Sequence, residues 1–310
     1  MRLRHTFKGA IDVNDPDHPP PDRLLRAGRA GAQPRRLTGH CEGARLLVLH
    51  ITNPLTDAAN VLLDEPSLHR QRQRLEQLQL EVPSVPFESR LAFGGAAAEI
   101  LKTAQETGCG MVVLGTRGRT GLGRLFMGSV AEQVVRNAPC PVVTVNSPSR
   151  EPAAEAEVSS GTAAPIRTVL HPTDFSGPCA EAFRVACELA GDQSARLTII
   201  HVVVPPTISP PNQPMPFPVP EDPREKLEEL LRLAQASAPG LQADYRVEKG
   251  DAAPRIVSAA QEMRCDLIVM GTHGRTGFGR VLMGSVAEQV LRTAPCPVVT
   301  VKATAAASRT

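Results

Sequence analysis

Gly271-Thr-His-Gly-Arg-Thr-Gly-Phe-Gly-Arg-Val-Leu-Met-Gly-Ser285 directly follows the apolar run Leu267–Met270. Nearly the same stretch, GTRGRTGLGRLFMGS, occurs at Gly115–Ser129, again after an apolar run, Met111–Leu114. A short apolar run of this kind predicts a buried strand, and the residues after Ser285 have helical spacing. The chain therefore predicts, twice, a strand that leads through a glycine-rich, arginine-bearing loop into a helix.

The two stretches belong to a duplicated domain. Gly115–Asn146 and Gly271–Lys302 share 25 of 32 residues, and weaker similarity extends further upstream in both copies. Residues 147–165 are rich in Pro, Ala, Ser and Glu without apolar periodicity, which predicts an exposed linker. We therefore expect a first domain at 1–146, the linker at 147–165, a second domain at 166–303 and a tail at 304–310.

The second copy alternates strands with helices. Its apolar spacing predicts strands at 166–171, 197–204, around 245–247, at 267–270 and at 297–301, and helices at 176–189, from 223, around 256–263 and at 286–293. Pro205–Pro223 contains nine prolines and is expected to be a loop within this copy. Continuous apolar strands that alternate with helices predict an α/β fold, with a parallel sheet covered on both faces.

The first copy is regular only from about Gly43. Its first 42 residues are rich in Arg, Gly and Pro and do not predict a normal first strand and helix. Ile11–Asn14 is one candidate for a displaced first strand. We therefore assign no ligand-binding residue to a first strand in this copy.

Composition limits the classes of partner. At 310 residues the chain is long enough for two domains that each bury a core. Its net charge of +2 and its single tyrosine, with no tryptophan, do not indicate a surface for nucleic acid, so we expect no such partner. No apolar run has the length of a signal peptide or a membrane span, so we expect a cytoplasmic protein without a membrane partner.

The seven cysteines, an odd number without any Cys-x-x-Cys, do not indicate a disulfide framework or a zinc site. Cys109, Cys140, Cys265 and Cys296 recur at matching positions of the two copies, inside apolar surroundings. We interpret them as small buried hydrophobic residues in preference to redox groups.

The glycine-rich loops suit a phosphate group. Ligands of open α/β sheets bind at the carboxyl ends of the strands, where each of these loops begins. Glycines let the backbone approach a ligand closely, and a helix N-terminus offers unpaired N–H donors and partial positive charge. Ser285 with Glu288, and Ser129 with Glu132, have the spacing of a capping box at the helix start.

The same residues also have a purely structural interpretation. In this interpretation the glycines serve only as turns, the serines only as caps, and Arg275 and Arg280 are solvated charges. The Gly-x4-Gly-Lys-Ser/Thr phosphate loop is absent, as is a dinucleotide Gly-x-Gly-x-x-Gly fingerprint. Without that lysine and that metal-binding hydroxyl, the site is better suited to holding a nucleotide than to cleaving it.

Three segments together resemble the universal stress protein family, in its ATP-binding subclass and as a tandem member. They are Pro172-Thr-Asp-Phe-Ser176, the spacing Gly271-x2-Gly274-x9-Gly284-Ser285, and the terminal APCPVVTV. The resemblance covers about 140 residues of the second copy and about 100 of the first. It implies a five-stranded parallel sheet of order 3-2-1-4-5, Rossmann-like and similar to the adenine nucleotide alpha hydrolases. It also implies ATP, or AMP or ADP, as ligand, with Mg²⁺ arriving on the ATP and not on a protein metal site.

The resemblance assigns nucleotide-binding roles residue by residue. Asp174 would contact the adenosine end, Val202 would line the base pocket, and the glycine loop would surround the ribose and phosphates. In the second copy these residues are Pro172, Thr173, Asp174, Val202, Gly271, His273, Gly274, Arg275, Gly284, Ser285 and Val286. In the first copy they are Ile51, Gly115, Arg117, Gly118, Gly128, Ser129 and Val130, and no counterpart of Asp174 can be placed.

The preferred hypothesis is a nucleotide-dependent regulatory or protective stress module without catalytic residues. A slow ATPase or self-phosphorylating protein, and an interaction scaffold with vestigial loops, are the alternatives. His171 and His201 lie near the predicted site, but neither forms a recognisable base and nucleophile pair, and both are interpreted as hydrogen-bonded structural residues.

Each copy ends in an apolar strand, Val142–Val145 and Val298–Val301, that would lie at a sheet edge. Pairing of the two strands within one chain would cover both edges and form a pseudo-dimer of the two domains, as the family's dimer contact implies. A homodimer through other faces stays open.

Overall fold

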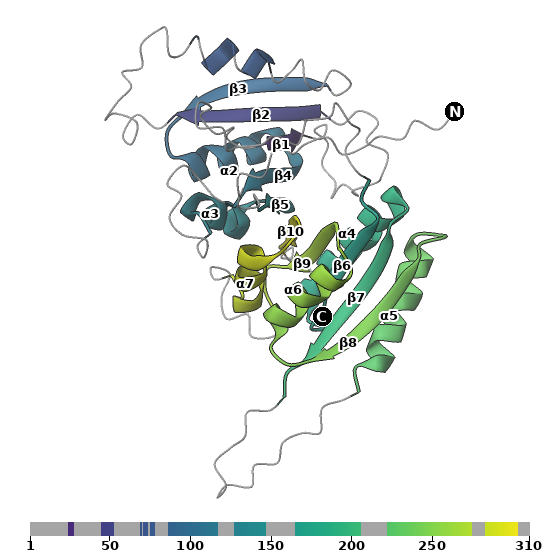
Figure 1. Ribbon diagram of the computed structural model, residues 1–310. Helices are drawn as coiled ribbons and strands as arrows, with labels where there is room; N and C mark the ends of the chain where they lie inside the picture. Colours follow the sequence, from purple (N-terminus) through teal and green to yellow (C-terminus); the bar gives the residue numbers. More distant parts are fainter. Residues whose placement is uncertain are drawn as a thin grey trace, which may run out of the picture. The chain divides into compact units, whose positions relative to one another are not determined.

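The computed structural model describes residues 24–27, 45–52, 69, 71–73, 75–77, 86–116, 127–146, 165–205, 222–274 and 283–302. The described residues form two compact units. One runs up to Pro165 and also includes Pro297–Lys302, and the other is Ile166–Cys296. Both are α/β units, as the sequence predicts, and in the second unit strands and helices alternate along the chain (Figure 1).

The second unit has a parallel sheet of order β8-β7-β6-β9. Its strands are β6 (Thr168–Pro172), β7 (Arg196–Val203), β8 (Ala243–Lys249) and β9 (Leu267–Gly271). Its helices are α4 (Gly177–Gln193), α5 (Arg224–Ser237), α6 (Ala252–Glu262) and α7 (Ser285–Thr293). These bounds differ from the predicted ones by a few residues at most, and the strand that starts the copy lies between its second and fourth strands.

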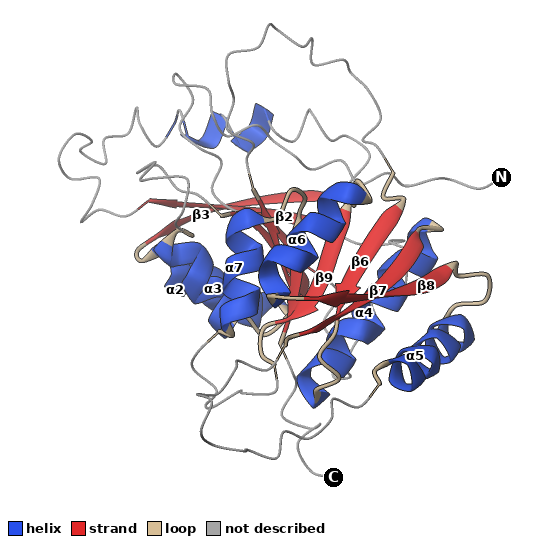
Figure 2. Cartoon of the chain, turned by 60° about the horizontal axis from the view of Figure 1, so that its bottom comes forward, coloured by secondary structure: helices blue, strands red, loops and turns tan. Residues whose placement is uncertain are grey.

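Helices cover both faces of this sheet. Figure 2 shows α4 and α5 on one face and α6 and α7 on the other, in agreement with the contacts between the members of each pair. All five residues of β9 are buried, and Leu197, Ile199 and Ile200 of β7 are completely inaccessible to solvent. Burial on two faces explains why these strands are continuous apolar runs and do not alternate with polar residues.

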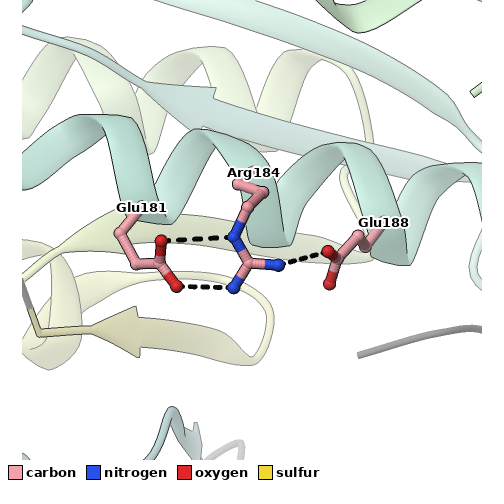
Figure 3. Close-up of polar contacts among 3 residues, drawn as sticks. All are labelled: Glu181, Arg184 and Glu188. Atoms are coloured by element: carbon pink, nitrogen blue, oxygen red, sulfur yellow. Dashed lines mark hydrogen bonds and ion pairs between the residues drawn. The ribbon is translucent and has the colours of Figure 1, made fainter. Parts of the chain in front are cut away.

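Helix α4 is amphipathic in the predicted way. Ala182, Val185 and Ala186 are buried against the sheet. On the exposed side, Arg184 binds Glu181 one turn before it, at 2.5 Å, and Glu188 one turn after it (Figure 3).

In the part of the chain that the structure describes, none of the helices has the length and the apolar character of a membrane span.

The first unit differs from the second at its first strand. It contains β1 (Leu24–Ala27), β2 (Arg45–Thr52), β3 (Phe87–Phe93), β4 (Cys109–Gly115) and β5 (Val142–Val145), in the order β3-β2-β1-β4-β5. Helices α2 (Ala96–Thr107) and α3 (Ser129–Asn137) contact each other and this sheet. Strand β1 is antiparallel to both β2 and β4, so the expectation of an all-parallel sheet is wrong for this copy. The alternative strand, 11–14, lies outside the described residues.

The last strand of the chain, β10 (Val298–Val301), pairs antiparallel with β5, as expected for two apolar edge strands. Val299 lies opposite Val143 at the centre of the pairing. On either side, the Thr144 hydroxyl donates to the Val298 carbonyl and the Thr300 hydroxyl donates to the Val142 carbonyl, both at 3.2 Å. These reciprocal bonds satisfy two buried hydroxyls and cover both apolar edges.

Candidate functional site

The candidate site of the second unit lies where two neighbouring strands end. Pro172 is the last residue of β6, and Gly271 is the last residue of β9. Strands β6 and β9 are adjacent and parallel, so their carboxyl ends lie side by side. The segments that follow them, Thr173–Asp174 and Thr272–Gly274, therefore leave the sheet at the same end. Two parts of the predicted motif, about 100 residues apart in sequence, are thus brought together.

The closest approach joins Asp174 to Gly274. A Cβ atom added at Gly274 would lie 2.6 Å from Oδ2 of Asp174, which is well inside van der Waals contact. Any other residue at this position would force the carboxylate to shift. The glycine of the loop and the aspartate of the first strand therefore belong to one site.

Local bonds orient the Asp174 carboxylate. Its Oδ1 accepts hydrogen bonds from the backbone N–H of Ser176 and from the thiol of Cys179, both at 3.0 Å. Burial, with a further contribution from this bond to Asp174, raises the pKa of Cys179 to about 11. The thiol therefore stays protonated near neutral pH and serves as a donor, while Oδ2 faces Gly274.

The two ends of the glycine-rich loop are held close together in both copies. The N–H of Gly284 donates to the Thr272 carbonyl at 2.9 Å, and the N–H of Gly128 donates to the Thr116 carbonyl at 2.8 Å. A Cβ on Gly284 would lie 3.4 Å from the Thr272 oxygen, so this glycine also packs tightly on the start of the loop. The predicted residues Arg275, Arg117 and Gly118 lie outside the described residues.

The expected capping boxes do not form. The N-cap residues of α7 and α3 are Gly284 and Gly128, and neither helix has a side-chain capping hydrogen bond. The serines are the first helical residues instead and are exposed, because the glycines before them take the extended N-cap conformation. In place of capping, Glu288 pairs with Arg292 at 3.2 Å, and Glu132 pairs likewise with Arg136 in the first copy. The first N–H groups of each helix therefore have no side-chain cap.

The two histidines of the region have structural partners. Nδ1 of the fully buried His171 lies 2.8 Å from the Val269 carbonyl and donates to it. Burial lowers the pKa of His171 to about 4, so the ring is neutral near neutral pH. Nδ1 of His201 likewise donates to the Thr173 carbonyl at 2.8 Å, which fixes the segment after β6. Both observations agree with the structural interpretation of these residues.

Two neighbours of the site were not predicted from the sequence. Phe175 has φ of 62°, in the left-handed region that a bulky side chain rarely adopts, and its ring lies 4.5 Å from the ring of His201. The ammonium of Lys226, on α5, lies 5.9 Å from the centre of the Phe175 ring. The position of Phe175 directly after Pro-Thr-Asp was a signal from which its place at the site could have been predicted. No local sequence pattern links the exposed Lys226 to the site.

The remaining predicted residues have clear places. Val202, partly exposed, lies near the end of β7 opposite Glu248, and Val286 follows Ser285 at the start of α7. His273 is bonded through Nδ1 to the Thr272 hydroxyl at 2.9 Å. In the described part of the chain, no group of three or more His, Cys, Asp or Glu side chains could hold a metal ion.

The first copy has the same two loop ends as the second copy, but its first strand cannot carry a counterpart of Asp174. Gly115 ends β4, Gly128, Ser129 and Val130 start α3, and Ile51 is buried in β2. Because β1 is antiparallel, Leu24 lies beside Val113 and Ala27 beside Cys109. The carboxyl end of β1 therefore lies beside the amino end of β4, and the glycine loop leaves from the other end of β4. A residue that follows β1 directly would start from the wrong edge to act as Asp174 does.

Comparison with known proteins agrees with this duplicated architecture. The profile of the universal stress protein family matches residues 24–146 and 165–302. The chain is 36% identical over 139 residues to a universal stress protein of Methanocaldococcus jannaschii, an overlap of 44% of this chain and 82% of the relative. It is 40% identical over 107 residues to one from Thermus aquaticus, which covers 33% and 78% of the two chains. The crystal structure of a universal stress protein from Archaeoglobus fulgidus has the same fold, with a TM-score of 0.58, 22% identity, and coverage of 84% of this chain and 86% of that one.

Proposed function

Because the chain belongs to the universal stress protein family, which acts in the response to stress, we propose that its second unit binds an adenine nucleotide. ATP, or AMP or ADP, is the proposed ligand, and its binding would make the protein a nucleotide-dependent regulatory or protective module. We place this protein in the cytoplasm.

One observation carries the proposal, which is the contact between Asp174 and Gly274. It puts a carboxylate, a hydrogen-bond acceptor for ribose or adenine groups, beside a glycine loop whose ends are 2.9 Å apart at Gly284 and Thr272. The N-terminus of α7 starts at the same point and favours an anion. Acceptor and anion-binding groups at one edge match the two ends of a nucleotide.

The proposed roles follow from these positions. Asp174 would bind the adenosine end, with Val202 beside the base, and Gly274, Ser285 and the first N–H groups of α7 would surround the phosphates. Mg²⁺ would enter on the phosphates of ATP. In this proposal β10 completes the five-stranded, Rossmann-like order 3-2-1-4-5 that starts with β8-β7-β6-β9. We also propose that the β5–β10 pairing lets the two domains act as a pseudo-dimer.

The test is calorimetric titration with ATP, with and without Mg²⁺, on the full chain and on Gly274→Val and Gly118→Val. A Cβ at Gly274 would take the space of the Asp174 carboxylate, so we expect Gly274→Val to abolish binding of one equivalent of ATP. Gly118→Val, the matched change in the copy without an aspartate beside its loop, should leave that equivalent intact. Circular dichroism of both variants separates loss of binding from loss of folding.

Two results would contradict the proposal. Absence of ATP binding by folded wild-type protein would leave the interaction scaffold as the function. Metal-dependent ATP hydrolysis that is lost in Asp174→Ala would instead favour the slow ATPase.

The two copies should differ in salt dependence if both bind nucleotide. The first copy has Arg117 where the second has His273, and arginine stays charged at all relevant pH. We therefore expect the affinity of the first copy to fall more steeply with salt.

A further inference from the structure

Two thiols touch in the first unit, at the sheet edge opposite the glycine loop. Cys109 is the first residue of β4, and Cys140 comes two residues before β5. Their Sγ atoms are 3.4 Å apart. The sequence favoured small buried hydrophobic residues here, and burial of Cys109 agrees with that, but burial alone does not require thiol-to-thiol contact.

The backbone places the two cysteines within the range of a disulfide. Val112 pairs with Val142, and the Val112 N–H donates to the Pro141 carbonyl at 3.0 Å. Continued by two residues, this register puts Cys140 opposite Gly110, one residue from Cys109. With neighbouring strands about 4.8 Å apart, the Cα atoms are then about 6 Å apart, inside the 4.4–6.8 Å range of disulfides. The backbone spacing is therefore compatible with a disulfide in the register that the two strands already have.

The second unit repeats the arrangement with the same spacing. Cys265 lies two residues before β9 and Cys296 two residues before β10, at the positions that match Cys109 and Cys140, and the Cys265 thiol donates to the Leu267 carbonyl at 3.1 Å. Contact with Cys296 lowers the pKa of Cys265, and contact with Cys265 raises the pKa of Cys296. The first pair behaves in the same way, with the pKa of Cys109 lowered and that of Cys140 raised. In the first pair, loss of the Cys109 proton would leave a thiolate 3.4 Å from the Cys140 thiol, which can donate to it.

We propose that Cys109 with Cys140, and Cys265 with Cys296, are peroxide-sensitive dithiols that form one reversible disulfide in each copy of the domain. The thiolate sulfur attacks one oxygen of hydrogen peroxide, breaks the O–O bond, and leaves a sulfenic acid and, after proton uptake, water. The second thiol attacks the sulfenic sulfur, loses its proton, and releases the oxygen as a second water. Two electrons pass from the two thiols to the peroxide, and a small-molecule thiol reverses the reaction.

This site is separate from the proposed nucleotide site and does not depend on it. Each disulfide would join the amino ends of two strands, whereas the glycine loop leaves from the carboxyl end of the first of them. The cross-link would enclose one strand, the loop and the helix after it.

The experiment is peptide mapping of the folded full-length protein. The chain is treated with hydrogen peroxide, free thiols are blocked with N-ethylmaleimide, and the product is digested with trypsin without reduction. We expect 103–117 linked to 137–150, and 265–275 linked to 293–302, each two hydrogen atoms lighter than the sum of its parts. Met111 and Met270 lie in these peptides, so their sulfoxide forms are included in the search. Dithiothreitol should abolish both links.

Variants identify the pairs. Cys140→Ala should remove only the first link and Cys296→Ala only the second. Cys187→Ala, which changes a buried cysteine of α4 outside both pairs, should remove neither. Oxidation of the wild-type chain in urea should give mixed pairings, which shows that the native contact selects the partners even if a variant folds poorly. Equal N-ethylmaleimide labelling of the four cysteines before and after peroxide, or native links to Cys179 or Cys187, would overturn the proposal.

Discussion

Acidification should destabilise the second unit through His171. Burial lowers the pKa of this histidine to about 4 from its ordinary value of 6.5, and its bond to the Val269 carbonyl and the charge of Asp174 offset the burial only in part. Between these two pH values the unfolded chain binds a proton at this position and the folded chain does not. Because the unfolded state binds more protons there, the free energy of unfolding must fall as the pH falls.

The magnitude follows from the two pKa values. Each pKa unit corresponds to about 1.4 kcal/mol, so the difference between 6.5 and about 4 amounts to roughly 3 kcal/mol. The effect begins as the pH falls through 6.5 and levels off below about 4, where the folded state is protonated too. A loss of this size is a large fraction of the stability of an ordinary domain.

The assay is urea unfolding of wild-type protein and His171→Gln over this pH range. The chain has no tryptophan, and its single tyrosine, Tyr245, lies in β8, so tyrosine fluorescence reports on the second unit. Glutamine can still donate to the Val269 carbonyl but does not titrate. Subtraction of the variant's pH profile cancels the carboxylates common to both proteins, and about 3 kcal/mol should remain. Parallel profiles for the two proteins would refute the reasoning.

Three further predictions concern packing and polar contacts. Gly191→Ala should cost about 1–3 kcal/mol, because its Cβ would lie 2.9 Å from that of Ala238, whereas Gly177→Ala, with open space around it, should be neutral or slightly stabilising; thermal unfolding compares the two. Arg184→Ala should cost under about 1 kcal/mol, since its ion pairs are partly exposed, and the cost should shrink in high salt; a salt-independent loss would contradict this. Asp266→Ala should cost about 1–3 kcal/mol, because Oδ2 accepts two backbone N–H groups at the start of β6, at 2.8 and 2.9 Å; unchanged stability in urea would argue against it.

Local pattern was enough to predict most of the second copy. The strand β9 is an unbroken apolar run, α4 carries apolar residues at helical spacing, and the loop from Gly271 carries its own glycines. These signals depend on neighbours within a few residues, where side-chain periodicity reports burial directly. The duplication extended the same predictions to the first copy from Gly43 onward, because similar sequences form similar helices and strands.

Local pattern failed where a choice between neighbouring positions or distant partners was involved. The sequence placed the capping role on Ser285, but the glycine before it takes the extended N-cap conformation and moves the helix start by one residue. The sequence pattern also did not predict β1 at 24–27. Four residues between Arg-, Gly- and Pro-rich stretches have too little periodicity to indicate a strand or its direction.

Periodicity and internal repetition in the amino-acid sequence were sufficient to predict a duplicated α/β protein with a glycine-rich loop after a buried strand in each copy. The contacts of Asp174 with Gly274 and of Cys109 with Cys140 could be found only from the folded chain. Both contacts depend on which strands are neighbours in the sheet. The order of strands is set by packing of the whole unit, so residues far apart in the chain meet at one edge without any local signal that they will.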